Sequence, residues 1–181
     1  MTFLRTLPLL ALALVVSACD TTDPEPEAAL VTVDVVAFEA FGNCETATNP
    51  GDFQFQVALV DAGNNVISST DFPTGLPYGT HPTASGGTVG LYEFNPRQRR
   101  AVDGTVSAER VRDVSGTFGV RFSGMEWDSA TLRDARFDDV QQIRSHPFED
   151  GLFQRVAGEQ SIAIGTTSDC RVELEYRLTI Q

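Results

Sequence analysis

The C-terminal segment RVELEYRLTI, residues 171–180, alternates strictly between polar and apolar side chains. A period of two is that of a β-strand with one face in a hydrophobic core and the other in water. The segment FQFQVALV, residues 53–60, starts with the same period and places its aromatic and aliphatic residues on one face. Both segments therefore predict half-buried strands of an antiparallel sheet.

Shorter apolar segments, separated by Gly, Pro and Asn turns, extend this pattern over the chain. We expect strands at 31–41, 66–70, 88–94, 118–123, 152–156 and 160–164, and a strand pair or one bulged strand at 101–111. No alternation of strands with helices appears. The fold class that we predict is all-β, a single antiparallel β-sandwich of about eight strands over residues 29–181, with a barrel as the alternative.

Two segments depart from this regular pattern. Residues 128–145 lack Gly and Pro, and Phe137, Val140 and Ile143 fall at helical spacing, so a short helix near 130–144 competes there with a strand or coil. Residues 71–88 are broken by seven Gly and Pro residues, and we predict a long loop. We interpret this loop as a mobile surface connection, with a functional loop as the alternative.

The N-terminal residues have a composition of their own. Arg5 precedes an apolar run at 7–16, which is too short to span a bilayer, since spanning takes roughly 20 residues. The small residues Ser17 and Ala18 then run directly into Cys19, and an acidic segment with two Pro follows at 20–28. A charged start, a short apolar region and small residues before a cleavage site are typical of a secretory signal.

This arrangement resembles the lipobox of a bacterial lipoprotein signal peptide. The resemblance implies that residues 1–18 are removed and that Cys19 is acylated and becomes the first mature residue. Residues 19–28 would then be the lipidated Cys and an extended tether. Two or more acyl chains anchor a protein stably. We expect an extracytoplasmic protein held to a membrane of the bacterial envelope, at the outer membrane or cell surface rather than the inner membrane.

Composition excludes several classes of function. The net charge is −12 at pH 7, which disfavours binding to nucleic acid or to anionic lipid through a basic patch. All 13 basic residues are Arg, so a P-loop, a Schiff-base lysine and a Ser–Lys nucleophile are excluded. The two His, His81 and His146, each precede Pro and have no evident nucleophile partner, and we interpret both as plain loop residues. We predict that the protein is not an enzyme.

The other two cysteines, Cys44 and Cys170, follow the first predicted strand and precede the last. Two remaining Cys in a secreted chain are most simply one disulfide, and antiparallel neighbouring strands would bring these positions together. A metal site would need more ligands than the two His supply, and a reactive thiol would need an electropositive niche, whereas Glu45 adjoins Cys44. We therefore predict a Cys44–Cys170 disulfide.

An acidic tract begins at Glu126 and Asp128, which would continue the apolar face of the strand at 118–123. Two ionised carboxylates are costly on a dry face. We therefore expect the strand to end or to bulge before Glu126, so that Met125 and Trp127 pack inward and the carboxylates reach solvent.

Three interpretations of this tract remain open. The first is a solvated strand end in an acidic protein, in which Asp134 and Asp138 pair with nearby Arg residues. The second is a Ca²⁺ site, since clustered carboxylates suit a hard cation, although the spacing is not that of an EF-hand. The third is a carboxylate pair for acid–base chemistry, as in glycoside hydrolysis.

Four motifs together resemble C2-like β-sandwich domains found in some bacterial lipoproteins. They are Cys44-Glu45, Gly-Asp-Phe-x-Phe-x-Val at 51–57, Glu126-Trp127-Asp128, and Cys-x-Val-x-Leu-x-Tyr at 170–176. C2 domains are often Ca²⁺, lipid or partner modules with their ligands in loops at one end. The resemblance implies metal ligands at Glu45, Asp52, Glu126, Asp128 and Asp134. The Glu-x-Asp of the later loop departs from the usual Asp-x-Asp of the family.

The function that we expect is a membrane-anchored, non-enzymatic binding or envelope-structural module. Its partners would be the membrane, through the lipid on Cys19, and an envelope protein or glycan. A Ca²⁺-binding C2-like module is the first alternative, and a carboxylate-dependent envelope hydrolase is the second. Ca²⁺ is the one candidate cofactor.

Overall fold

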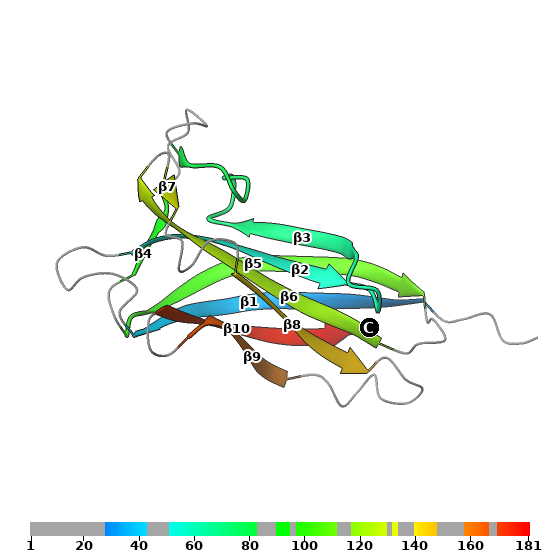
Figure 1. Ribbon diagram of the computed structural model, residues 1–181. Coiled ribbons are helices and arrows are strands. Elements are labelled where there is room, and N and C mark those ends of the chain that lie inside the picture. The colour runs from blue at the N-terminus through cyan, green and yellow to red at the C-terminus, as the bar shows by residue number, and fades with distance from the viewer. Residues whose placement is uncertain are drawn as a thin grey trace, which may run out of the picture.

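A computed structural model describes residues 28–42, 51–82, 90–94, 97–111, 117–129, 132–133, 140–147, 158–166 and 170–181. These residues form two antiparallel sheets packed face to face (Figure 1). The strands are β1 (Ala28–Gly42), β2 (Gly51–Val60), β3 (Val66–Phe72), β4 (Tyr92–Phe94), β5 (Arg99–Val111), β6 (Thr117–Ser129), β7 (Leu132–Arg133), β8 (Val140–Pro147), β9 (Gly158–Gly165) and β10 (Cys170–Ile180). The predicted all-β antiparallel sandwich is confirmed.

We call the two layers sheet A and sheet B. Sheet A has four strands in the order β5-β1-β10-β9, so the first and last strands of the domain are central neighbours. Sheet B has six strands, in which β2 lies between β3 and β6, while β4 also pairs with β2, and β7 and β8 with β6. The alternation predicted for 171–180 is that of β10, whose apolar residues are buried and whose polar residues face outward.

Aromatic rings fill the centre of the space between the sheets. Phe38 of sheet A meets Phe55 and Phe122 of sheet B, with ring centroids 4.4 and 5.6 Å apart. Its ring also contacts the edge of Phe72 at 5.4 Å. Offset and edge-to-face aromatic pairs add to the free energy gained by burying their area. The apolar faces that the sequence pattern identified thus form the core.

A β-bulge interrupts the pairing in sheet A. The register of β1 with both β5 and β10 shifts between Val35 and Ala37. The neighbouring segment of β5 includes Gly104, where an added Cβ would lie 2.5 Å from the ring of Phe72. Of the two alternatives for residues 101–111, the structure therefore shows one bulged strand. Glycine is required at position 104 because the ring of Phe72 occupies the space that a side chain would take.

The segment near 130–144 was ambiguous in sequence and is extended in the structure. Its described residues belong to strands β7 and β8 and not to a helix. The helical spacing of its apolar residues was misleading because β8 pairs with β6 over eight residues, and tertiary pairing overrides a local pattern. The short strands β4 and β7 bring the described strands to ten. The strand expected at 152–156 lies outside the described residues.

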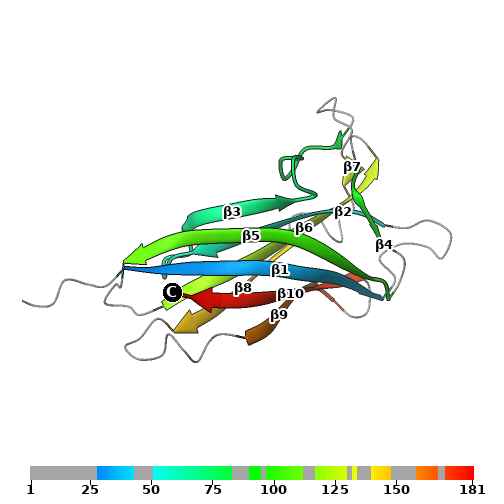
Figure 2. The same ribbon diagram turned by 180° about the vertical axis from the view of Figure 1, so that it is seen from behind.

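The sandwich has two distinct ends, which Figure 2 shows from behind. At the N-terminal end, β1 and β3 begin and β5 and β10 finish, and Leu30 exchanges two backbone hydrogen bonds with Gln181. At the opposite end, which we call the loop end, lie β4, β7 and the close of β1, where Gly42 pairs with Cys170.

Candidate functional site

The carboxylate of Glu126, which we expected to reach solvent, is buried. Strand β6 continues without a break through Glu126, which pairs with Phe53 of β2 and has no exposed surface. Its Oε1 lies so close to Gly51 that an added Cβ would approach to 2.6 Å. The expectation that Glu126 would reach solvent was wrong, because the strand extends past Gly124 and holds the side chain on the inner face. This position withholds Glu126 from any substrate on the surface.

The residues proposed as metal ligands are only partly brought together. Asp52 precedes Phe53, the partner of Glu126, so the alternation of a strand places Asp52 and Glu126 on opposite faces of sheet B. Asp128 lies near the end of β6. Glu45 and Asp134 lie outside the described residues. Within the part of the chain that the structure describes, no three His, Cys, Asp or Glu side chains gather as a metal site.

The first part of the long loop covers the outer face of sheet B around Gln54 and Trp127. Gln54 is fully buried there, its Oε1 accepts hydrogen bonds from Trp127 Nε1 at 3.2 Å and Gly79 N at 3.1 Å, and its Nε2 donates to Thr80 O at 2.6 Å. The ring of His81 meets the ring of Trp127 with centroids 5.2 Å apart. The described residues up to Pro82 are therefore docked on the sheet, and Trp127 is buried from the outer side.

Replacing Gln54 with Ala is expected to release this loop. The change would remove three hydrogen bonds and deprive the buried Trp127 Nε1 of this acceptor, at a cost of about 1–3 kcal/mol. Amide hydrogen exchange of residues 73–82 should accelerate while that of β10 is unchanged. The control is Ser69→Ala on the exposed part of β3. Equal exchange of residues 73–82 in the two variants would show that Gln54 does not hold the loop on the sheet.

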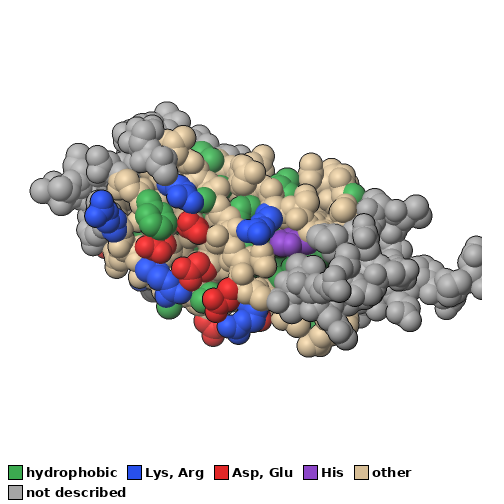
Figure 3. Space-filling model, turned by 90° about the horizontal axis from the view of Figure 1, so that it is seen from below, with side chains coloured by type: hydrophobic (Ala, Val, Ile, Leu, Met, Phe, Trp, Pro, Cys, Tyr) green, Lys and Arg blue, Asp and Glu red, His purple; other side chains and the backbone are tan. Residues whose placement is uncertain are grey.

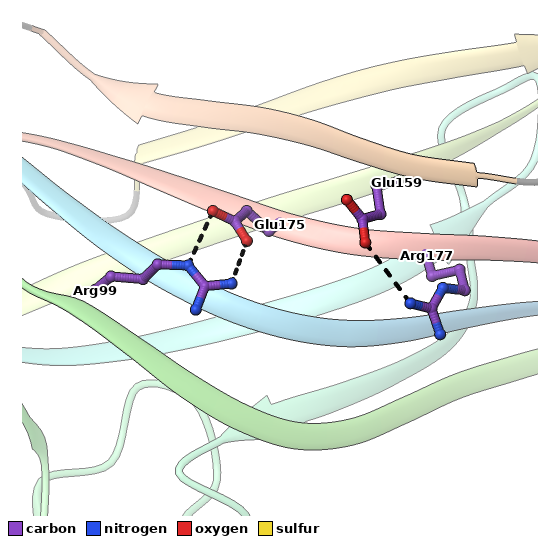
Figure 4. Close-up of polar contacts among 4 residues, drawn as sticks. All are labelled: Arg99, Glu159, Glu175 and Arg177. Carbon is purple, nitrogen blue, oxygen red and sulfur yellow. Dashed lines mark hydrogen bonds and ion pairs between the residues drawn. The ribbon is translucent and has the colours of Figure 1, made fainter.

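The outer face of sheet A carries a stripe of ordered charges. Arg99 of β5 reaches across β1 and donates to both carboxylate oxygens of Glu175, at 3.1 and 2.5 Å (Figure 4). This hydrogen bond lowers the pKa of Glu175 and raises that of Arg99. Arg171 pairs with Glu173 at 3.0 Å, and Arg177 with Glu159 at 3.7 Å. Paired in this way, both signs of charge are held in a fixed order along β10.

A hollow of about 290 Å³ opens in this face beside the bulge of β1. Its lining residues come from β1, β9 and β10: Val36, Glu159, Gln160, Ser161, Glu173, Glu175 and Tyr176. Seen from below, acidic and basic side chains gather over one half of the described surface, toward the loop end (Figure 3). The hollow is smaller than most pockets for small molecules, which have volumes of roughly 300–1,000 Å³. Its size suits a side chain of a larger partner.

A buried polar pair joins the two sheets. His146 of β8 is only 4% exposed, its Nε2 lies 2.9 Å from the hydroxyl of Tyr176 on β10, and its ring stacks on Phe118. Burial, with a smaller effect of Arg144, lowers the pKa of His146 to about 4, and burial raises the pKa of Tyr176 to about 12. The interpretation of His146 as a loop residue was wrong. The signal was Tyr176 itself, since a buried Tyr hydroxyl usually finds a partner.

This pair predicts a pH dependence of stability. The pKa of His146 falls from an ordinary 6.5 to about 4 in the folded state, so the unfolded chain binds the proton more readily. Above pH 6.5 the neutral pair makes its full contribution to the free energy of unfolding. As the pH falls from 6.5 to about 4, this contribution is lost, and the loss is on the order of 3 kcal/mol. Urea unfolding between pH 7 and 4 should show a shallower slope of stability against pH for His146→Gln than for the wild type. Parallel slopes would contradict the prediction.

The cysteines are described only in part. Cys170 is buried at the first position of β10, opposite Gly42, and Gly42 lies two residues before Cys44. The prediction that the close of the first strand and the start of the last lie side by side is confirmed. Cys44 itself lies outside the described residues, as does Cys19, so the disulfide and the lipidation stay predictions.

Comparison with solved structures gives distant likenesses, of which two are described here. A C2 domain protein from Ramazzottius varieornatus is 16% identical, with a TM-score of 0.44, over 86% of this chain and 90% of that one. A C2 domain of a plant extended synaptotagmin 1 is 10% identical, with a TM-score of 0.44, over 83% of this chain and 93% of that one. No family model and no curated protein matches. Among the described residues, no helix is both long and apolar enough to cross a bilayer.

Proposed function

We propose that this chain is a lipid-anchored, extracytoplasmic binding module without enzymatic activity. The lipobox-like segment ending at Cys19 supports the anchor, and the compact sandwich that begins at Ala28 supports a folded domain only a short tether away from it. Its partner would be an envelope protein or glycan. The Cys44–Cys170 disulfide belongs to this proposal, since an extracytoplasmic compartment permits it.

The observation that carries the binding role is the outer face of sheet A. Each outward charged residue of β10, from Arg171 to Arg177, has a charged partner within 4 Å. Isolated exposed pairs add little to stability, so this ordered stripe is better explained by recognition than by folding. Along β10 these charges run positive, negative, negative and positive, and such a fixed order selects a partner with the complementary order. The adjacent hollow would accept one protruding side chain of that partner.

The anchor is tested by fractionation of cells that produce the full chain. The wild type is expected in the membrane fraction, and Cys19→Ser in the soluble extracytoplasmic fraction or as an uncleaved precursor. Both proteins keep Cys44 and Cys170, so their domains should fold alike. A wild-type protein that is fully soluble would overturn the anchor.

The binding face is tested with a photo-crosslinking amino acid at Ser161, which lines the hollow. A discrete adduct is expected in cells with the probe at Ser161. The matched control carries the probe at Ser69, an exposed serine on the other sheet. The same adduct from both positions, or none from Ser161, would contradict a binding role for this face.

A further inference from the structure

The large exposed apolar residues of the described chain are gathered at one end. They are Leu30, Val66 and Ile67, whose exposed fractions are 40%, 47% and 37%. Leu30 lies near the start of β1, and Val66 and Ile67 begin β3, so all three belong to the N-terminal end of the sandwich (Figure 2). Scattered exposed apolar residues are normal, but these coincide with the end that carries the predicted tether.

The tip between β2 and β3, residues 61–67, presents Val66 and Ile67 and is ordered by hydrogen bonds. Asp61 accepts hydrogen bonds from Asn65 N at 2.8 Å and from Asn65 Nδ2 at 2.9 Å, and its own carbonyl accepts one from Asn64 N. The turn at 61–65 contains Asp, Ala, Gly and two Asn, so the carboxylate of Asp61 is its one charge, and that carboxylate accepts hydrogen bonds from Asn65. An ordered, nearly uncharged tip with two aliphatic side chains can enter a lipid interface at little cost in charge burial.

The tether limits how far this tip can lie from the bilayer. Ala28 follows Cys19 by nine positions, and a fully extended chain spans at most about 3.3–3.6 Å per residue, so the N-terminal end stays within roughly 30 Å of the lipid. A short tether of this kind gives an effective concentration in the millimolar range, at which a weak contact becomes substantially occupied.

We propose that Val66 and Ile67, assisted by Leu30, rest in the lipid interface of the membrane that holds Cys19. This inference rests on the lipid anchor proposed above. The contact is apolar, and the acidic chain is repelled by anionic lipid, so the surface that suits it is zwitterionic. Contact at the N-terminal end turns the loop end away from the bilayer and exposes the outer face of sheet A sideways to a partner.

The test uses the full lipidated chain in phosphatidylcholine vesicles, with an added Trp reporter. Ile67→Trp places the reporter at the tip, Ser69→Trp two residues farther along β3, and Glu93→Trp at the loop end on β4. Vesicles with brominated acyl chains quench a Trp that enters the interface. The added emission of the tip reporter is expected to fall by about half, that of Ser69→Trp by less, and that of Glu93→Trp hardly at all.

Flotation of the same vesicles separates the two proposals. Protein that does not float has no anchor, and both proposals fail. Protein that floats but shows equal quenching at all three positions retains its anchor and overturns the membrane contact. A Val66→Asp/Ile67→Asp variant should float like the wild type; if this variant instead abolishes a dimer that the wild type forms in detergent, the tip is an interface between copies and the membrane contact is wrong.

Discussion

Replacing Phe38 with Ala is expected to lower the free energy of unfolding by about 3–5 kcal/mol, because the change opens a cavity at the centre of the aromatic core. The ring of Phe38 is fully buried and joins sheet A to Phe55, Phe72 and Phe122 of sheet B. Equilibrium unfolding in urea would measure the loss as a lower midpoint at an unchanged slope.

The matched control for this prediction is Phe41→Ala on the same strand. Phe41 is half-buried at the loop end, where the guanidinium of Arg171 lies 5.5 Å from its ring centroid. Its loss removes a surface cation–π contact, which is worth roughly 0.5–1 kcal/mol when exposed. Similar losses for the two variants would mean that the sheets are not joined through Phe38.

Removing the predicted disulfide is expected to have the second large effect. The Cys44→Ser/Cys170→Ser variant should lose about 2–5 kcal/mol relative to the oxidised wild type, since a bridge between distant positions restricts the unfolded chain. The pairing of Gly42 with Cys170 already brings the two strand ends together. The bridge should therefore constrain the unfolded chain without distorting the fold.

Reductant provides the control for the disulfide. With dithiothreitol present, the wild type and the double serine variant should unfold at nearly the same urea concentration, and without it they should differ. Wild-type protein that unfolds identically with and without reductant would show that Cys170 forms no stabilising bridge.

The fold was predictable because its strands obey a simple physical rule. One face of β10 and the start of β2 are apolar at every second residue, and this period has few structural explanations. The pairing of the first and last strands also followed, from the positions of Cys44 and Cys170. The helical spacing of Val140 and Ile143 was misleading, because the structure of this segment depends on the partner strand β6 and not on local spacing.

The candidate site was less predictable from sequence. The burial of Glu126 depends on how far β6 extends beyond Gly124, and no local residue marks that boundary. Gln54 reads as an outward polar residue of β2, and only the docking of Gly79 and Thr80 buries it. The ion pairs of Arg99 with Glu175 and of Arg177 with Glu159 join separate strands, so they require the strand order of sheet A.

The most direct test of the proposed anchored module is the intact mass of the mature N-terminal peptide from membranes of producing cells. The peptide is expected to begin at Cys19 and to lack residues 1–18. It should carry the added mass of a diacylglyceryl group, and its N-terminal amine should be either free or acylated through an amide. A mature peptide that begins at another residue, or that begins at Cys19 without lipid, would contradict the anchor and with it the membrane contact of Val66 and Ile67.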